Sequence, residues 1–253
     1  MRYASRVLLA LITCLPRLAC AQSFAPDTPE AGSVEEIARA TTEARFLSPW
    51  VAYLPAATGV VSPRSFLHRI PGAPGELVNS ATAYAYCRAL AGSSPRVRLF
   101  TIGRSEEGRD IVLLAIADEA GIHDLERLKA ATAALADPRR TDAAAAEQLV
   151  ASARPIYYIN AGLHSDESGS TESALELAYR LAVSEQPMIR RIRENLVVLI
   201  NPVSNPDGRD KQVEWFYRYL KGKTDAAPAA AASPHCKSFE PFNILDGLIS
   251  MTT

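Results

Sequence analysis

The stretch that decides the fold is residues 155–202, PIYYINAGLHSDESGSTESALELAYRLAVSEQPMIRRIRENLVVLINP. It holds two short apolar runs, at 155–160 and 196–200, separated by a polar loop at 162–170 and by apolar residues at helical spacing over 171–184. Short apolar runs beside turn-forming residues predict strands, and apolar residues three and four positions apart predict a helix. We therefore expect the order strand, loop, helix, strand.

The residues before this stretch also show strands that alternate with helices. A strand is expected at 97–102 and a buried strand at 110–117, and the charged turn Gly103–Gly108 between them indicates a hairpin. Helices are expected at 33–46, 80–91, 124–135 and 141–153, with Ser33, Asp124 and Thr141 capping the first, third and fourth. Strands that alternate with helices predict an α/β fold, in which helices cover the faces of a sheet.

The composition is that of an ordinary globular protein. The 253 residues are 48% hydrophobic and 22% charged, with a net charge of −1. The balance of 27 Lys and Arg against 28 Asp and Glu argues against a nucleic-acid-binding protein driven by phosphate contacts. After the N-terminus no apolar run reaches eighteen residues, so we expect no membrane span.

The N-terminus has the pattern of a signal peptide over residues 1–21. Arg2 and Arg6 precede a short apolar run at 7–15, and Ala19-Cys20-Ala21 resembles a cleavage site. A lipoprotein signal is the minor alternative. We therefore expect a secreted or periplasmic protein.

Two cysteines, Cys87 and Cys236, remain after the signal peptide is removed. A bridge between them stays an alternative, although the helical pattern around Cys87 favours a small core residue.

Outside the alternating elements the chain has three regions of different character. Residues 22–32 are polar and are expected to form a disordered leader, and the five prolines of 47–78 predict a looped segment that crosses the domain surface. Together we treat 22–78 as an N-terminal extension. Residues 226–233 are Ala/Pro-rich, and no periodic pattern follows up to residue 253.

The strongest candidate for chemistry is the pair His164 and Glu167, in the loop after the strand at 155–160. Ligands gather at the carboxyl ends of strands in open α/β sheets, and His₂Glu is a common ligand set of catalytic zinc. The spacing H-x-x-E alone is weak, and a solvated loop that caps the next helix is the alternative.

Other polar segments are less specific. Asn201–Gly208 contains Asn-Pro and Asp-Gly and is typical of a double turn. Gly103–Asp110 lacks the pattern of a phosphate loop or a nucleophile elbow, so a charged hairpin turn is favoured. Arg218, among aromatic residues, is either a carboxylate-binding residue or a surface residue stacked on its neighbours. His68, His123 and His235 have no obvious partners and are taken as non-functional.

Taken in order, three of these segments resemble the zinc carboxypeptidases of the carboxypeptidase A/B superfamily. Gly103–Arg109 resembles the G-x-S-x-E-G-R turn of that family, His164–Glu167 its H-x-x-E zinc motif, and Asn205–Gly208 its N-P-D-G turn. The resemblance covers about 80–223, and we place a partial zinc carboxypeptidase-like domain at 79–225.

The resemblance implies an α/β/α sandwich with a mixed, twisted sheet. It also implies one zinc ion held by two His and one Glu, with His164 and Glu167 matching the first two ligands, and hydrolysis of a peptide substrate by a zinc-bound water. A family Arg polarises the substrate carbonyl, and Arg218 is its nearest match here.

The family's second zinc His, its Asn-Arg pair and its catalytic Glu have no match in this chain. His235 comes too soon after the N-P-D-G turn, and Glu240 has no strand context. We therefore expect an N-terminal portion of the domain, incomplete at its C-terminus, with 226–253 as a foreign or frameshifted tail. We further expect an incomplete zinc site, little or no peptidase activity, and an open sheet edge at 197–200 or its neighbours.

Two alternatives to a zinc carboxypeptidase remain open at this stage. One is a secreted relative that binds peptides or cell-wall fragments without turnover, and the other is a zinc deacylase or amidohydrolase. The sequence leaves the preferred substrate and the oligomeric state open.

Overall fold

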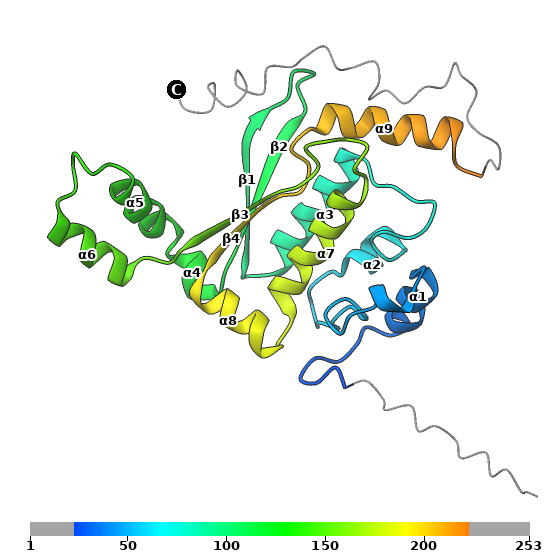
Figure 1. Cartoon of the computed structure of the whole chain (residues 1–253), viewed down its shortest axis with the longest axis horizontal. Coiled ribbons are helices and arrows are strands. Elements are labelled where there is room, and N and C mark those ends of the chain that lie inside the picture. The colour runs from blue at the N-terminus through cyan, green and yellow to red at the C-terminus, as the bar shows by residue number, and fades with distance from the viewer. Residues whose placement is uncertain (1–22, 223–253) are drawn as a thin grey trace, which may run out of the picture.

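A computed structural model describes residues 23–222, which form one mixed sheet flanked by helices (Figure 1). The strands are β1 (Val97–Arg104), β2 (Asp110–Ile116), β3 (Ile156–Asn160) and β4 (Val197–Asn201), in the spatial order β1-β2-β4-β3. The β1–β2 and β2–β4 pairs are antiparallel, and the β3–β4 pair is parallel. All four strands were predicted from their apolar runs, and the mixed sheet is confirmed.

The two inner strands bury side chains on both faces of the sheet. Successive strand residues point to opposite faces, so β2 and β4 divide their apolar residues between two cores. Leu114 and Ile200 belong to the larger core, which α3 (Ser80–Ser93) and α7 (Gly169–Val183) cover, and Ala115 and Val197 belong to the smaller one. The helices α4 (Glu119–His123) and α5 (Leu125–Leu135) supply Ile122 and Leu128 to the smaller core. The α/β/α sandwich is therefore confirmed.

The remaining helices are α1 (Ser33–Ala40), the 3-10 turn η1 (Ala44–Phe46), α2 (Pro63–Leu67), α6 (Ala143–Ser152), α8 (Pro187–Asn195) and α9 (Pro206–Tyr219). Four helices, α2, α4, α8 and α9, were not predicted from the sequence. The predicted first helix was also too long, since α1 ends at Ala40. Ser33 is not its cap: Gly32 holds that position, and the Ser33 hydroxyl instead accepts a hydrogen bond from the Leu54 amide.

Two other predicted caps differ from the structure. Asp124 precedes α5, but its side chain makes no capping hydrogen bond and pairs with Arg127. Asp142 rather than Thr141 caps α6, since its carboxylate accepts the Ala145 amide at 2.8 Å. An Asp one residue closer to the helix was the better capping candidate.

The prediction of a disordered leader at 22–32 is wrong for residues 23–32. The Asp27 carboxylate accepts hydrogen bonds from the Ser184 hydroxyl and the Glu185 amide, both at 2.6 Å, and from the Tyr53 hydroxyl at 2.8 Å. These bonds attach the start of the extension to the end of α7. The polar composition of residues 22–32 predicts disorder, because it gives no information about the distant partners that hold Asp27 in place.

The looped character of residues 47–78 is confirmed, with the single turn of α2 inside it. Tyr53 and Leu54 are buried, and the Tyr179 hydroxyl of α7 donates to the Pro55 carbonyl at 2.7 Å. The extension lies along α7 (Figure 1). The prediction that 47–78 only crosses the surface is wrong, because Tyr53, Leu54 and Val78 are buried.

Several predictions fall outside the described residues, namely the signal peptide at 1–21, the tail at 226–253, Cys236 and His235. Cys87 is fully buried in α3, as a core residue would be, and burial raises the pKa of its thiol to about 12. None of the helices within residues 23–222 is long and apolar enough to cross a membrane.

Among residues 23–222 the sheet has two edge strands, β1 and β3, and the edge beside β4 is β3. Within residues 23–222, β4 is paired on both sides, whereas β3 pairs only with β4. Ile156, Tyr157 and Tyr158 are 41%, 61% and 52% exposed. An apolar edge strand with unpaired backbone groups is a template for association with another strand.

Tyr157→Lys should therefore reduce self-association of the protein, because a charge on an edge strand opposes strand pairing between molecules. Sedimentation velocity at increasing protein concentration measures this. Val150→Lys on α6, where the native residue is also exposed, is the control. Equal behaviour of both variants and the unmodified protein would show that β3 does not drive association.

Candidate metal site

His164 and Glu167 lie in the loop between β3 and α7, at the carboxyl end of the parallel strand pair. Backbone hydrogen bonds fix the start of this loop. The Ser204 amide donates to the Ala161 carbonyl at 2.9 Å, and the Asn205 amide donates to the Gly162 carbonyl at 3.1 Å. The residues that follow β3 therefore lie beside those that follow β4.

Gly162 makes this approach sterically feasible. Its φ of +67° lies in the left-handed region, and a Cβ there would be 3.0 Å from the Thr171 hydroxyl oxygen and 3.2 Å from the Val203 Cα. Only glycine adopts such a backbone without strain in so narrow a space.

The end of the loop is held by the first turn of α7. The Ser170 hydroxyl donates to the Glu167 carbonyl at 2.9 Å and accepts the Gly162 amide at 3.1 Å. Both ends of the segment that carries His164 and Glu167 are thus tied together by one side chain.

We therefore expect Gly162→Ala to lower the free energy of unfolding by about 1–3 kcal/mol, the usual cost of a strained backbone. Thermal or urea-induced unfolding measures the loss. Gly169→Ala is the matched control at the other end of the loop, because no atom lies within 4 Å of the added Cβ. A loss of the same size in both variants would contradict the steric argument.

Both candidate ligands are accessible to an ion. His164 is half-buried and Glu167 is exposed. Within residues 23–222 neither side chain makes a hydrogen bond or ion pair, so their donor atoms are available. In this described part of the chain, however, no group of three or more His, Cys, Asp or Glu side chains is placed to hold a metal.

The described residues therefore fit a zinc ion only in part. A catalytic zinc takes three protein ligands and a water, and this loop supplies two candidates.

The Gly103–Arg109 segment is the end of the β1–β2 hairpin, and it binds the start of α9. The Asp207 carboxylate accepts hydrogen bonds from the Ser105 hydroxyl at 2.7 Å, the Arg109 guanidinium at 2.7 Å and the Glu107 amide at 3.1 Å. Arg109 also donates to Asp210 at 3.0 Å. This turn is therefore a structural clamp on the N-P-D-G segment.

The N-P-D-G segment itself is a helix start rather than the expected double turn. Asn205 caps α9, its side chain accepting the Gly208 amide at 2.9 Å, and Pro206 occupies the first turn. Proline is favoured there because its missing N–H would have no helical partner.

Burial acts to raise the pKa of Asp207, but the hydrogen bonds from Ser105, Glu107 and Arg109 outweigh it and hold that pKa below its usual range. A carboxylate with a lowered pKa contributes stability above its unfolded pKa of about 3.9, and that contribution is lost as the pH falls through the folded value.

Asp207→Asn should cost about 1–3 kcal/mol of stability at pH 7, because the amide cannot satisfy all three donors. The difference between the variant and the unmodified protein should shrink below about pH 4. Urea unfolding across pH 3–7 tests both statements. Glu126→Gln, an exposed site on α5, should show neither effect, and a pH-independent difference at Asp207 would refute the ionic explanation.

Two buried charges were missed by the sequence analysis. Glu172 on α7 and Arg209 on α9 are only 2% and 1% exposed. The Arg209 guanidinium donates to the Val78 carbonyl at 2.8 Å and to the Ser168 carbonyl at 3.0 Å, so it contacts the end of the loop. A signal existed for Glu172, which falls on the apolar face of its helix with Leu175 and Tyr179.

Arg218 lies near the C-terminal end of α9, twelve residues or about 18 Å beyond Pro206 along the helix axis. It is exposed, pairs with Glu214 and lies over the Tyr219 ring. These contacts match the surface alternative, and its substrate role stays a prediction. His68 and His123 are exposed, and His123 lies 3.3 Å from Asp124.

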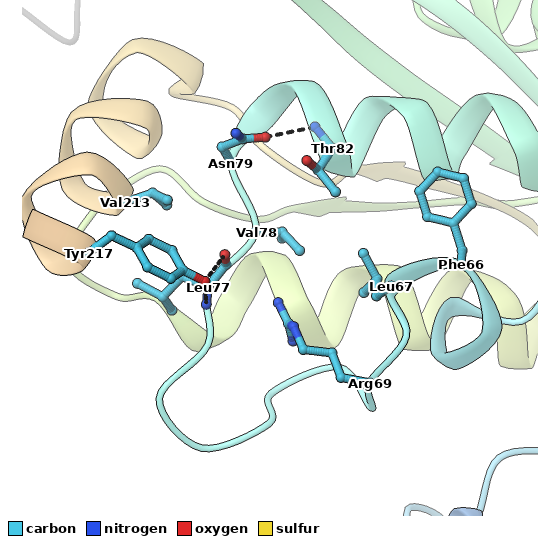
Figure 2. A pocket seen from close by; sticks show the side chains of 9 residues that line it. All are labelled: Phe66, Leu67, Arg69, Leu77, Val78, Asn79, Thr82, Val213 and Tyr217. Atoms are coloured by element: carbon cyan, nitrogen blue, oxygen red, sulfur yellow. Dashed lines mark hydrogen bonds between the residues drawn. The ribbon is translucent and has the colours of Figure 1, made fainter. Parts of the chain in front are cut away.

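Figure 2 shows a pocket of about 360 Å³ that no residue of the loop 162–170 lines. It is formed where the extension meets the start of α3 and the second half of α9, with Tyr217 at one side donating to Glu76 at 2.7 Å. Its lining residues are Phe66, Leu67, Arg69, Leu77, Val78, Asn79, Thr82, Val213 and Tyr217. Neither candidate metal ligand lines it.

A family model described as zinc carboxypeptidase matches residues 83–233. No curated protein matches the chain.

Solved structures similar to this chain include two carboxypeptidases and a fibrinolysis inhibitor. The carboxypeptidase A of Helicoverpa armigera is 21% identical over 55% of this chain, with a TM-score of 0.40. The metallo-carboxypeptidase of Burkholderia cenocepacia is 20% identical over 68%, with a TM-score of 0.35. The bovine thrombin-activatable fibrinolysis inhibitor is 15% identical over 55%, with a TM-score of 0.36. The chain spans 27%, 37% and 34% of these three proteins, respectively.

Proposed function

Because this chain belongs to the zinc carboxypeptidase family, we propose that it is the metal-ligating portion of a zinc-dependent metallocarboxypeptidase, a protease that removes C-terminal residues from peptides. His164 and Glu167 would hold the zinc, which in such enzymes activates a water for attack on the peptide carbonyl. The observation that carries this proposal is the pair of unengaged donor side chains on one loop beside the parallel strand pair.

The number of ligands limits what the chain can do alone. Two protein ligands hold zinc less firmly than three, and a catalytic site also needs a group that takes a proton from the bound water. We therefore propose that the isolated chain binds zinc weakly and has little or no peptidase activity. Export through the signal-peptide pattern at residues 1–21, and the domain limits at 79–225, are part of the same proposal.

The proposal is tested by zinc content and turnover together. After equilibration with zinc, the protein should hold clearly less than one ion per chain, and His164→Ala and Glu167→Gln should lower the content further, because each removes a ligand. Elemental analysis measures the zinc, and a C-terminal peptide substrate with and without chelator measures activity.

His123→Ala is the control, since His123 is an exposed histidine on α4. If His164→Ala leaves the zinc content unchanged, the ligand assignment is wrong. Chelator-sensitive turnover by the pure chain would contradict the proposed lack of activity.

A second candidate is a non-catalytic relative that binds peptides or cell-wall fragments. It is favoured by the lack of a three-ligand group within residues 23–222. Zinc content near zero, together with retained peptide binding, would select it. A zinc amidohydrolase or deacylase would instead require a filled metal site and a substrate other than a peptide.

A further inference from the structure

The cluster around Arg209 joins three separate parts of the chain. Glu172 on α7 accepts the Val78 amide at 2.8 Å and the Gly72 amide at 3.2 Å, and the Arg69 guanidinium lies 3.2 Å from its carboxylate. Gly72, Val78 and Arg69 all belong to the extension. The carboxylate of Glu172 is thus a buried anchor for residues 69–78, beside the more exposed bonds that Glu76 and Leu77 make with Tyr217.

Arg209 links Glu172 to the metal loop, residues 162–170, which carries His164 and Glu167. One side chain reaches the Val78 carbonyl through Nε and the Ser168 carbonyl through Nη1, while Nη2 lies 3.7 Å from Glu172. Its Nη2 makes no hydrogen bond among residues 23–222. The planar guanidinium is therefore shared between the extension and the end of the loop.

Burial makes the three parts interdependent. Loss of solvent lowers the pKa of Arg209, and the neighbouring Glu172 carboxylate opposes that effect. A buried charge that loses its partners is left uncompensated, so Arg209 depends on the nearby Glu172 carboxylate, and Glu172 depends on Arg69 and Arg209 together. The extension supplies further partners to both.

The contact with Ser168 bears directly on a candidate ligand. Ser168 follows Glu167 in the chain, and its amide donates to the Asp166 carbonyl at 2.8 Å. A shift of the Ser168 carbonyl therefore changes the backbone that carries Glu167. Ser170 holds the same backbone from the other side.

We propose that Arg209 is a positioning residue that couples the conformation of the metal loop, residues 162–170, to the docking of the extension segment 69–78. A docked segment holds Arg209 in place and orders the loop, and a metal ion bound by the loop in turn stabilises the docked segment. The effect must be mutual, because the metal loop and the segment 69–78 both act on the position of Arg209, and coupling between two sites is thermodynamically reciprocal. The metal half of the proposal rests on the proposed function.

Hydrogen exchange of the backbone amides tests the coupling without any metal. Arg209→Lys keeps the charge beside Glu172 but lacks the fork that reaches both carbonyls. It should speed exchange in 162–170 and in 69–78 together, by about tenfold. Arg193→Lys is the matched control, because Arg193 is equally buried and donates to the Leu181 and Ser184 carbonyls at the far end of α7.

Arg69→Gln keeps the proposal testable if Arg209→Lys fails to fold. Arg69 is partly exposed, and its side chain bonds to Glu172 and to the Ile70 carbonyl rather than to the loop, yet its loss should speed exchange in 162–170 through Glu172 and Arg209. Acceleration confined to 69–78, or equal acceleration of both segments in Arg193→Lys, would overturn the coupling.

Hydrogen exchange of the unmodified protein with added zinc chloride is the second test, and it examines the metal half of the proposal. Zinc should slow exchange in 162–170 and in 69–78, and neither effect should occur in His164→Ala. If zinc slows only the loop, the coupling is wrong and the proposed function stands. If zinc slows neither segment while Arg209→Lys and Arg69→Gln still speed both, the ligand assignment fails and the coupling stands.

Discussion

The arrangement of the site depends on a short series of backbone hydrogen bonds that continues the β3–β4 pairing beyond the strands. The Ala161 amide donates to the Asn201 carbonyl, and the amides of Ser204 and Asn205 donate back to Ala161 and Gly162. These bonds hold the loop of His164 against the start of α9. Gly162 suits this place because its φ is +67° and a Cβ would lie only 3.0 Å from the Thr171 hydroxyl oxygen and 3.2 Å from the Val203 Cα. The position of the loop is therefore set by strand pairing before any side chain of the site contributes.

Charged side chains then hold the start of α9 in the position that these backbone bonds give it. Asp207 is held by the end of the β1–β2 hairpin, and Arg209, one turn away from Asn205, is held by Glu172 and the extension. The Asp207 carboxylate and the Arg209 guanidinium are both poorly exposed, so each depends on its partners to offset the cost of burying a charge. The start of α9 is thus fixed from two directions, by the hairpin on one side and by the extension on the other.

The sequence predicted the elements with strong local signals and missed those that depend on distant partners. The four apolar runs were recognised as strands, but their order in the sheet is set by non-local pairing. The helix α9 was missed because Asn205-Pro206 and Asp207-Gly208 are typical of turns, although Asn followed by Pro is also a helix start. Glu172 and Arg209 could not be matched as a pair, because nothing local links a charge on α7 to one on α9. Likewise, Asp27 looked like part of a disordered leader because its partners lie at the end of α7.

The Gly103–Arg109 turn carries part of the family resemblance, but its side chains serve the fold rather than the candidate metal site. Gly103–Arg109 lies at the tip of a hairpin, and its Ser105, Glu107 and Arg109 all bind Asp207 rather than the metal loop. Its residue types are explained by that clamp: a hydroxyl and a guanidinium to donate, and Gly108 at a φ of +83° to turn the chain. Because Asp207 starts the helix that carries Arg209, the clamp acts on the loop of His164 only through α9. The ordered set of motifs therefore marks the zinc carboxypeptidase family, and within it the Gly103–Arg109 turn has a structural part, whereas the proposed zinc chemistry rests on His164 and Glu167.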